Sequence, residues 1–321
     1  MQSAQISNLH SFISFVITAR AVRLKNVDHS VAVSIVIPLY NADEVIADTI
    51  RSALAQTWVD REILVIDDGS TDGSAEIVKT FGDQVRYFHF DNAGVAKSRN
   101  RGIALSRGQY IALLDHDDLW NPTKLEKQVR VLETRPEVGL VFTGIVHLER
   151  DGRPRQKFPT GPPSRFYQLF VKGFGPTPSA AMLRRSVIEK AGGFDERFGS
   201  AGLDDHEFWP RIAQQCEIVL IDEPLTYHRH REVKPPEVEL SHRFLLNEAL
   251  MEQFGHDRVK RRYLLEERVA SLADLGKWRL MQGDQAGGRA YLRESLGLCL
   301  RESCNMKIAW RSLNRLVRSY L

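Results

Sequence analysis

The chain lacks several features that would place it in a specialised class of protein. It has only three cysteines, an odd number without the paired spacing of a metal site, which excludes a disulfide scaffold and is typical of a reducing compartment. No run approaches the roughly 18 consecutive apolar residues of a membrane-spanning helix. The net charge is only +3, too small to indicate a nucleic-acid partner. We therefore predict a cytoplasmic protein that binds no nucleic acid.

What is present fits a globular protein. Hydrophobic residues make up 43% of the chain and charged residues 26%, and 321 residues allow one large domain or two ordinary ones. Residues 1–30 have no basic start, long apolar stretch or small-residue cleavage site, so we do not expect a secretory signal there. We predict a tail or a short amphipathic helix for this segment.

Apolar runs alternate with helical patterns from residue 31 onward. The runs read as strands buried on both faces, at 33–37, 62–66, 85–89, 110–114 and 138–143. Amphipathic helical patterns separate them, at 43–55, 74–81, 94–106 and 123–134. This alternation predicts an α/β fold with a mostly parallel central sheet and helices on both faces.

Polar side chains follow these strands where each one ends, and they include Asn41, Asp68, Asn92, Asp115 and Asp117. The carboxyl ends of parallel strands meet at one edge of a sheet, which is where ligands bind in such folds. Two aspartates one residue apart repel each other unless a cation lies between them, and hard oxygen ligands suit Mg²⁺ or Mn²⁺. Solvated turns and helix caps are the alternatives for these residues taken singly.

Four segments, in order, carry a resemblance to a known family. They are residues 34–41 (Ser-Ile-Val-Ile-Pro-Leu-Tyr-Asn), 66–72 (Ile-Asp-Asp-Gly-Ser-Thr-Asp), 92–102 with Gly94, Arg99 and Gly102, and 114–118 (Leu-Asp-His-Asp-Asp). Together they resemble glycosyltransferase family 2 over about residues 31–232. The resemblance implies the GT-A fold, which is Rossmann-like. It also implies transfer of a sugar from a nucleotide-diphosphate sugar, here most plausibly a UDP-sugar, to an acceptor hydroxyl.

The resemblance implies a donor site built from the first three motifs. Asp68 resembles the family carboxylate that accepts a hydrogen bond from the uracil ring, and Pro38, Tyr40 and Asn41 would line the base pocket. Gly94 would allow close backbone approach to the donor. Lys97 and Arg99 would place positive charge opposite the diphosphate, at the start of a helix whose N–H groups attract anions. The alternative for Arg99 and Arg101 is an exposed helix face, and we expect Arg101 to lie on one.

The fourth motif implies the metal site. Asp117 would hold Mn²⁺ or Mg²⁺ against the diphosphate, Asp115 would contact the ribose or the metal, and His116 between them is assigned to the donor site. A metal neutralises charge on the departing nucleoside diphosphate. His230, in a basic loop, is a further candidate ligand, with a solvated histidine as the alternative.

An inverting transfer needs a base on the far side of the sugar. Residues 202–212 resemble the family segment in which an acidic pair precedes a helix, and by that pattern Asp205 is the general base. Pro210 inside the expected helix leaves the choice between Asp204 and Asp205 open. The alternative is that both aspartates cap the helix. Trp209 is assigned to the core.

Residues 233–321 follow a Pro-Pro pair and read as a helical extension, with helices at 241–254, 258–283, 284–300 and 307–321. From residue 257 onward there are 14 Lys and Arg against 7 Asp and Glu. Three roles remain open for this basic extension: packing on the catalytic domain or a partner, peripheral contact with anionic lipid at the inner face of the membrane, or a solvated surface. The acceptor would be a glycan or a lipid-linked glycan.

Two rival functions are less consistent with these residues. A nucleotidyltransferase of similar fold would need a glycine-rich basic loop after the first strand, and residues 38–41 do not form one. A non-catalytic sugar-nucleotide-binding or scaffold protein would have lost its site residues, whereas Asp68, Asp117 and Asp205 are all present. The sequence therefore favours an enzyme with residues 31–232 as its glycosyltransferase domain.

Overall fold

The computed structural model describes residues 31–149, 153–158, 177–199, 202–229 and 236–302. Its centre is one nine-stranded sheet in the order β3-β2-β1-β4-β8-β6-β9-β5, with β7 paired to β6. The strands are β1 (Val33–Leu39), β2 (Arg61–Asp67), β3 (Arg86–His89), β4 (Tyr110–Leu113), β5 (Leu119–Trp120), β6 (Val138–Leu148), β7 (Pro154–Phe158), β8 (Ala181–Arg184) and β9 (Glu217–Arg229).

The sheet is mixed, and six of its nine strands point the same way. Strands β1, β2, β3 and β4 pair in parallel. Strand β8 lies between β4 and β6 and is antiparallel to both, so β6 and its parallel neighbour β9 share the direction of β4. The predicted mostly parallel sheet is confirmed. The fifth predicted strand, 138–143, corresponds to β6, which continues to Leu148. In the sheet, β8 separates β6 from β4.

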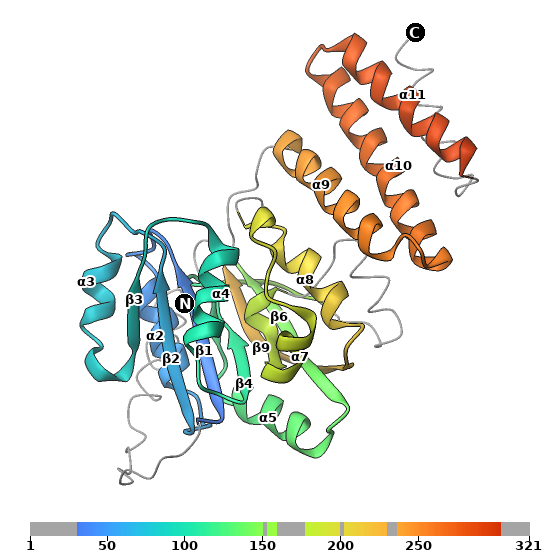
Figure 1. Ribbon diagram of the computed structural model, residues 1–321. Coiled ribbons are helices and arrows are strands. Elements are labelled where there is room, and N and C mark those ends of the chain that lie inside the picture. Colours follow the sequence, from blue (N-terminus) through green and yellow to red (C-terminus); the bar gives the residue numbers. More distant parts are fainter. Residues whose placement is uncertain (1–30, 150–152, 159–176, 200–201, 230–235, 303–321) are drawn as a thin grey trace.

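Helices cover both faces of the sheet (Figure 1). Alternate side chains of β1 point to opposite faces, because successive residues of a strand do so. One face packs Ile35 and Ile37 against α2 (Ile46–Leu54), α3 (Ser74–Lys79) and α5 (Lys124–Thr134). The other packs Val36 against α4 (Val95–Leu105), α7 (Arg185–Ala191) and α8 (Asp204–Ile212). Short 3₁₀ turns lie at Gly82–Gln84, Pro178–Ala180 and Glu196–Phe198.

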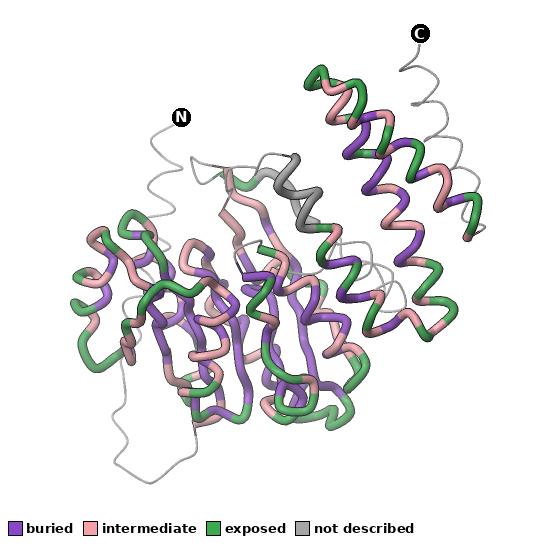
Figure 2. Tube along the Cα trace, turned by 45° about the horizontal axis from the view of Figure 1, so that its top comes forward, coloured by how far each residue is buried: buried purple, intermediate pink, exposed green. Residues whose placement is uncertain are grey.

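The C-terminal extension is helical, as predicted, with α9 (Pro236–Phe254), α10 (Arg258–Met281) and α11 (Gln285–Arg301). Helices α10 and α11 form a hairpin, and α9 lies between that hairpin and α8 (Figures 1 and 2). A Cβ on Gly276 would lie 2.9 Å from the carbonyl oxygen of Gly288, so the hairpin backbones approach closely where two glycines meet. The predictions for residues 1–30 and 307–321 lie outside the described residues.

Five basic side chains in the extension's described part form ion pairs with acidic side chains. Arg261 pairs with Glu302, Arg268 with Glu248, and Arg279 with Asp284. Lys260 and Arg262 pair similarly within α10 and its start. Within the residues that the structure describes, no helix has both the length and the apolar character needed to cross a bilayer.

Candidate active site

The ends of β1, β2 and β4 meet at one edge of the sheet, as the sequence predicted. The parallel register sets Leu39 beside Asp67 and Val36 beside Leu113. Backbone bonds continue past the strand ends, with the Asp68 N–H donating to Leu39 O at 2.8 Å. Asp68 and Asp115 therefore leave neighbouring regions of the same edge, and both carboxylates are buried.

A polar turn follows β1. Asn41 has a positive φ of 43°, which asparagine tolerates better than most residues, and its Oδ1 accepts a bond from the Thr71 N–H at 2.8 Å. The side chain of Tyr40 beside it is open to solvent, with 46% of the residue exposed. Pro38 is buried within the strand, and its carbonyl oxygen lies 3.1 Å from His116 Nδ1. The ring of His116 is thus turned toward β1.

Asp68 lies under the start of α4. Its carboxylate accepts bonds from the N–H groups of Ala93 at 3.0 Å and Gly94 at 2.7 Å, and it pairs with Arg101 Nη1 at 3.3 Å. Gly94 precedes the helix with a φ of 92°, a conformation that favours glycine. A carboxylate has about four acceptor positions, so Asp68 keeps roughly one for a ligand donor.

Asp67, the residue before Asp68, stabilises the turn that follows β2. It accepts bonds from the Tyr87 hydroxyl at 2.5 Å and the Ser70 N–H at 2.8 Å. Burial acts to raise the pKa of Asp67, but these hydrogen bonds outweigh it and hold the pKa below its usual range. The same pairing and burial raise the pKa of Tyr87. Asp67 is therefore a charged anchor for the loop that carries Asp68.

Arg99 lies at the centre of a buried ion cluster. The guanidinium, in a residue only 4% exposed, bonds Asp115 Oδ1 at 2.6 Å through Nη2 and Asp204 Oδ2 through Nη1. The guanidinium also stacks over the Phe194 ring at 5.4 Å. The sequence predicts that Arg99 adds positive charge facing the diphosphate, and in this structure its guanidinium bonds these two carboxylates. Arg99 thereby ties the tip of β4 to the start of α8.

The cluster carries more negative than positive charge. Burial raises the pKa of Asp204 to about 6, and the nearby Asp205 and Asp115 act in the same direction, while Arg99 opposes them. The two carboxylates raise the pKa of Arg99 in turn, although its burial acts to lower it. One guanidinium shared between two buried carboxylates thus leaves an acidic site, which suits a cation.

The acidic pair of α8 divides into two environments. Asp204 is 1% exposed and is committed to Arg99. The side chain of Asp205 is 13% exposed, and its Oδ1 accepts the N–H of His206 at 2.8 Å and lies 2.7 Å from His206 Nδ1. Leu203 is the N-cap residue, so neither aspartate caps the helix. Helix α8 continues through Pro210 to Ile212, and Trp209 is fully buried, as predicted.

The remaining predicted residues are less closely integrated. Lys97 projects from α4 with a half-exposed side chain and pairs with Glu196 at 3.6 Å. Asp117 lies in the turn after β4 and is partly exposed. His230 lies outside the described residues. The structure thus brings together Asp115, Arg99 and the Asp204–Asp205 pair. Asp68 lies on the same edge at the end of β2, which β1 separates from β4.

The carboxylates of this site are the candidate ligands for a divalent cation. In the described ranges no three His, Cys, Asp or Glu side chains are arranged to hold a metal ion by themselves. Mg²⁺ is commonly held by one or two carboxylates together with substrate phosphates, so such a cluster is not required. The acidic surplus around Asp115 and Asp204, with Asp117 two residues on, fits an ion that shares its coordination with a diphosphate.

Sequence reasoning missed three residues that support this site. Arg101 is not on an exposed face: it stacks over the Phe90 ring at 4.3 Å while pairing with Asp68. The Ser179 Oγ accepts the Asp115 N–H at 3.0 Å, and its carbonyl accepts Trp120 Nε1 at 2.7 Å. Lys124 is fully buried below Trp120. The spacing of Arg101 one helical turn beyond Lys97 was available as a signal, whereas the contact to Ser179 spans 64 residues.

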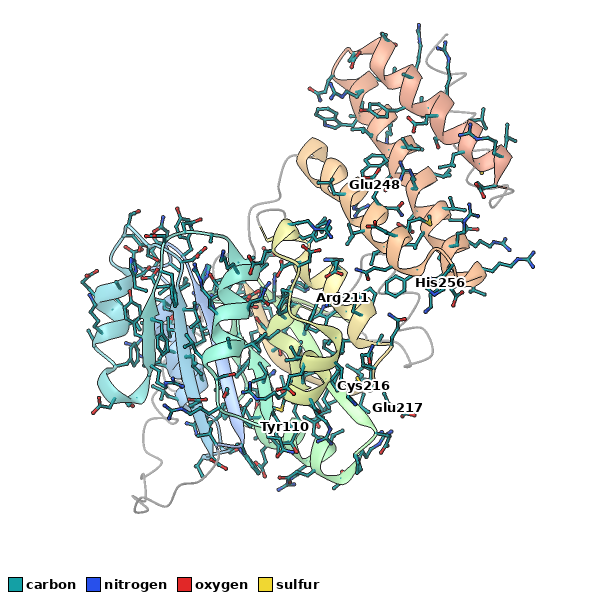
Figure 3. All side chains as sticks on the ribbon, in the orientation of Figure 1. Tyr110, Arg211, Cys216, Glu217, Glu248 and His256 are labelled. Carbon is teal, nitrogen blue, oxygen red and sulfur yellow. The ribbon has the colours of Figure 1, made fainter. Side chains whose placement is uncertain are left out.

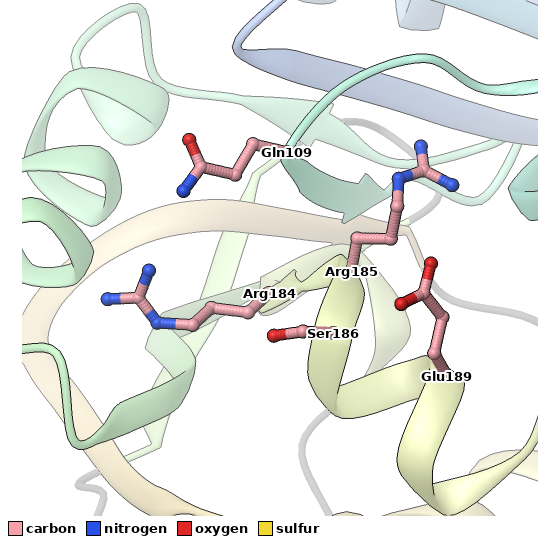
Figure 4. Close-up of a pocket in the computed structure, with 5 residues that line it drawn as sticks. All are labelled: Gln109, Arg184, Arg185, Ser186 and Glu189. Atoms are coloured by element: carbon pink, nitrogen blue, oxygen red, sulfur yellow. The ribbon is translucent and has the colours of Figure 1, made fainter.

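A shallow pocket at the opposite edge of the sheet is structural. It has a volume of about 250 Å³ and is lined by Gln109, Arg184, Arg185, Ser186 and Glu189 (Figure 4). Arg184 Nε donates to Val138 O at 2.7 Å, and Arg185 Nε donates to Gly108 O at 2.8 Å. Both guanidinium groups are therefore engaged by backbone carbonyls, and this pocket is remote from the carboxylate edge.

Comparison with known proteins agrees with the fold. Residues 34–192 match the family model described as Glycosyl transferase family 2. The putative teichuronic acid biosynthesis glycosyltransferase TuaG of Bacillus subtilis is 37% identical over 144 residues, 44% of this chain and 57% of TuaG. Matched stretches cover between 18% and 57% of the first curated relatives.

Solved structures share the fold over almost the whole chain. The structure of S. aureus TarS 1–349 in complex with UDP-GlcNAc aligns with a TM-score of 0.63 at 17% identity, over 90% of this chain and 89% of that one. A mannosyltransferase from Pyrobaculum calidifontis, in complex with GDP-Man and Mn²⁺, aligns with a TM-score of 0.54 at 16% identity, over 97% of this chain and 93% of that one. The expected GT-A glycosyltransferase fold is confirmed.

Proposed function

We propose that this protein transfers a sugar from a nucleotide-diphosphate sugar to an acceptor hydroxyl during polysaccharide or glycan assembly. The observation that carries this proposal is the Arg99 bridge. It connects Asp115, in the donor-side motif at the β4 tip, to Asp204, which adjoins the proposed base. The proposed donor site and the proposed base would thereby share one acidic centre. The family match and the glycan-related name of TuaG support the same reaction class.

The donor's nucleoside would bind along the ends of β1 and β2. Asp68 is held by two backbone N–H groups and Arg101, and it retains acceptor capacity for a base N–H. The exposed ring of Tyr40 would stack on the base, with Pro38 and Asn41 shaping the pocket beside it. We take a UDP-sugar as the first donor to test, because TarS was solved with UDP-GlcNAc. Lys97, near the Gly94 turn, would face the diphosphate.

Asp117, with Asp115 behind it, would hold Mn²⁺ or Mg²⁺ against the donor diphosphate. A bound ion supplies neutralisation of the charge that develops on the leaving nucleoside diphosphate. Asp115 is oriented for this position by Arg99 and by the Ser179 hydroxyl that accepts its N–H. A role for His230 in the same site stays a proposal from the sequence.

Asp205 would act as the general base. The acceptor oxygen attacks the anomeric carbon as the bond from that carbon to the diphosphate oxygen breaks, and the acceptor proton passes to the Asp205 carboxylate. Attack opposite the leaving group inverts the anomeric centre. Asp204 is less suited to this task, because it is buried against Arg99, whereas Asp205 is partly open.

The test is nucleotide binding, measured by thermal shift or calorimetry with UDP, GDP, dTDP and CDP, each with and without Mn²⁺. At a hundredfold excess over its dissociation constant, a ligand specific for the folded state raises stability by about 2.7 kcal/mol. We expect one nucleotide to stabilise the wild type in the presence of Mn²⁺, and Asp117→Ala to abolish the metal-dependent part. Binding without hydrolysis of the sugar donor would favour the non-catalytic alternative, and no binding would refute the donor site.

Contact with a membrane is a separate proposal that rests on the basic extension. Ion pairs within α10 and α11 neutralise part of its charge, so the lipid interaction would be weak and sensitive to salt. Co-sedimentation with vesicles of phosphatidylglycerol and phosphatidylcholine at low and physiological salt tests it. Equal recovery with purely zwitterionic vesicles would exclude a specific attraction to anionic lipid.

A further inference from the structure

We propose that helix α9 of the C-terminal extension positions the base-bearing helix α8 through Gln253, so that the extension is part of the catalytic apparatus. This inference rests on the proposed function, since it assigns a role relative to Asp205. Helices α8 and α9 lie side by side, and Arg211, labelled in Figure 3, lies on α8. Gln253 is a positioning residue in this account and does not itself touch substrate.

The polar part of the contact centres on Glu207. This residue is 1% exposed, and its Oε1 accepts Gln253 Nε2 of α9 at 2.8 Å. Arg211, one turn further along α8, bonds both carboxylate oxygens, at 2.7 and 2.6 Å. A buried carboxylate is stable only when paired and hydrogen-bonded. Gln253 thus supplies, from another part of the chain, a donor to a buried charge.

An apolar contact holds the other end of α8. Leu246 and Leu250 of α9 belong to one buried cluster with Phe198, and Leu203 packs against it. Leu203 is the N-cap residue of α8, directly before Asp204 and Asp205. The start of α8, which carries the proposed base, therefore contacts α9 at two points. Leu203 packs against the apolar cluster, and Glu207, one turn later, accepts the hydrogen bond from Gln253.

The opposite side of α8 is tied to the donor half of the site. Asp204 is bonded to Arg99 of α4. Arg211 donates to Ala191 O at 2.6 Å and Gly193 O at 2.7 Å, and the adjoining Phe194 N–H donates to Asn100 Oδ1 on α4 at 2.8 Å. Helix α8 is thus held between α4 and α9, and the spacing of Asp205 from the donor depends on both partners.

The geometry shows why a hydrogen bond, and not packing alone, sets this spacing. A pocket of about 380 Å³ opens between α7, α8 and α9, lined by Lys190, Arg211, Gln214, Gln253 and Phe254 among others. Polar side chains, including Gln253 and Arg211, therefore make up much of the lining at this end of the interface. A misplacement of about 1 Å can cost roughly a hundredfold in rate, so loss of the Gln253 bond should act on catalysis.

The test compares Gln253→Glu and Gln253→Leu with Gln285→Glu in the full chain. The first places a like charge against Glu207, and the second removes the donor with little change in size. The third makes the same charge change on α11, at an exposed residue. The measurements are UDP affinity, kcat and KM for hydrolysis of UDP-GlcNAc with Mn²⁺, and hydrogen exchange over residues 204–212.

We expect Gln253→Glu to lower kcat by about tenfold to a hundredfold, with KM and UDP affinity within about twofold of wild type. Exchange should quicken over 204–212 and not over 67–74. Gln253→Leu should show a smaller effect of the same kind, and Gln285→Glu none. Adding Glu207→Gln to Gln253→Glu restores one amide and one carboxylate across the contact, and should recover part of kcat.

Two results would overturn the inference. One is an unchanged kcat with unchanged exchange over 204–212 in Gln253→Glu. The other is a uniform loss of stability and UDP affinity across the protein, which would make the contact merely structural. If the wild type neither binds UDP nor hydrolyses the donor, the proposed donor has failed, and the exchange measurement still decides whether α9 positions α8.

Discussion

Replacement of Arg99 by methionine offers the sharpest test of the acidic centre. Methionine keeps much of the side-chain volume and removes the guanidinium that Asp115 and Asp204 share. Both carboxylates would then be buried without their cation. Removal of one partner from a buried ion pair costs about 3–5 kcal/mol, and we expect Arg99→Met to lower the free energy of unfolding by this amount near pH 7.5.

The loss of stability in Arg99→Met should increase with pH. Burial already raises the folded-state pKa of Asp204 to about 6, and without Arg99 it should rise further above the unfolded value of about 3.9. A group whose folded pKa is raised stabilises the fold when protonated, and that contribution is lost as pH increases through the folded pKa. The gap between wild type and Arg99→Met should therefore widen from pH 5 to pH 7.5, by about 1.4 kcal/mol for each pKa unit gained.

Urea denaturation at the two pH values measures both quantities. Arg101→Met is the matched control, because Arg101 lies on the same helix and pairs with Asp68 from a more exposed position. We expect a cost of about 1 kcal/mol for this control, in the range of partly exposed pairs. A loss below about 1 kcal/mol for Arg99→Met, or equal losses at both pH values, would refute the shared buried bridge.

Two further predictions concern buried titratable groups. Because burial raises the pKa of Asp204 to about 6, its carboxyl group costs stability as the pH rises from about 4 to 6.5. Asp204→Asn should remove this pH dependence, which is worth up to about 3 kcal/mol. Parallel pH profiles of the free energy of unfolding for wild type and Asp204→Asn would contradict this prediction. Lys124 is fully buried, with its Nζ 2.8 Å from Gln128 Oε1 and over the Trp120 ring at 4.0 Å, and burial lowers its pKa well below the usual value. The unfolded chain therefore binds a proton at Lys124 more readily than the folded protein does. Wild type should gain stability relative to Lys124→Met as the pH rises from about 7.5 to 9.5. A constant difference in the free energy of unfolding over that range would show that Lys124 stays charged.

Much of the donor half could be predicted because its signals are local. Each predicted strand from 33 to 114 lies within two residues of an observed one, since a run of apolar residues that stops at a polar turn encodes both the strand and its end. The edge shared by Asp68 and Asp115 follows from parallel pairing alone. The helical pattern of the extension likewise emerged from periodicity within each segment.

The partners of the charged residues were not predictable in this way. Arg99 was expected to face a diphosphate, yet it bridges two carboxylates, one of which is 105 residues away. Arg101 was expected on an exposed face and instead lies across Phe90. Strand β8 entered the sheet between β4 and β6, although it follows β6 in the chain. None of these contacts leaves a periodic trace in the sequence.

The sequence by itself determined the class of fold, the strand ends that carry the acidic motifs, and the resemblance to a family. Apolar periodicity and turn chemistry act over a few residues, so they can be read without knowing what lies nearby in space. Only the tertiary structure decided which carboxylate of the 204–205 pair is committed to Arg99, and that α8 packs against α9. Those outcomes depend on burial, which strengthens charge interactions between distant segments and makes an unpaired charge costly.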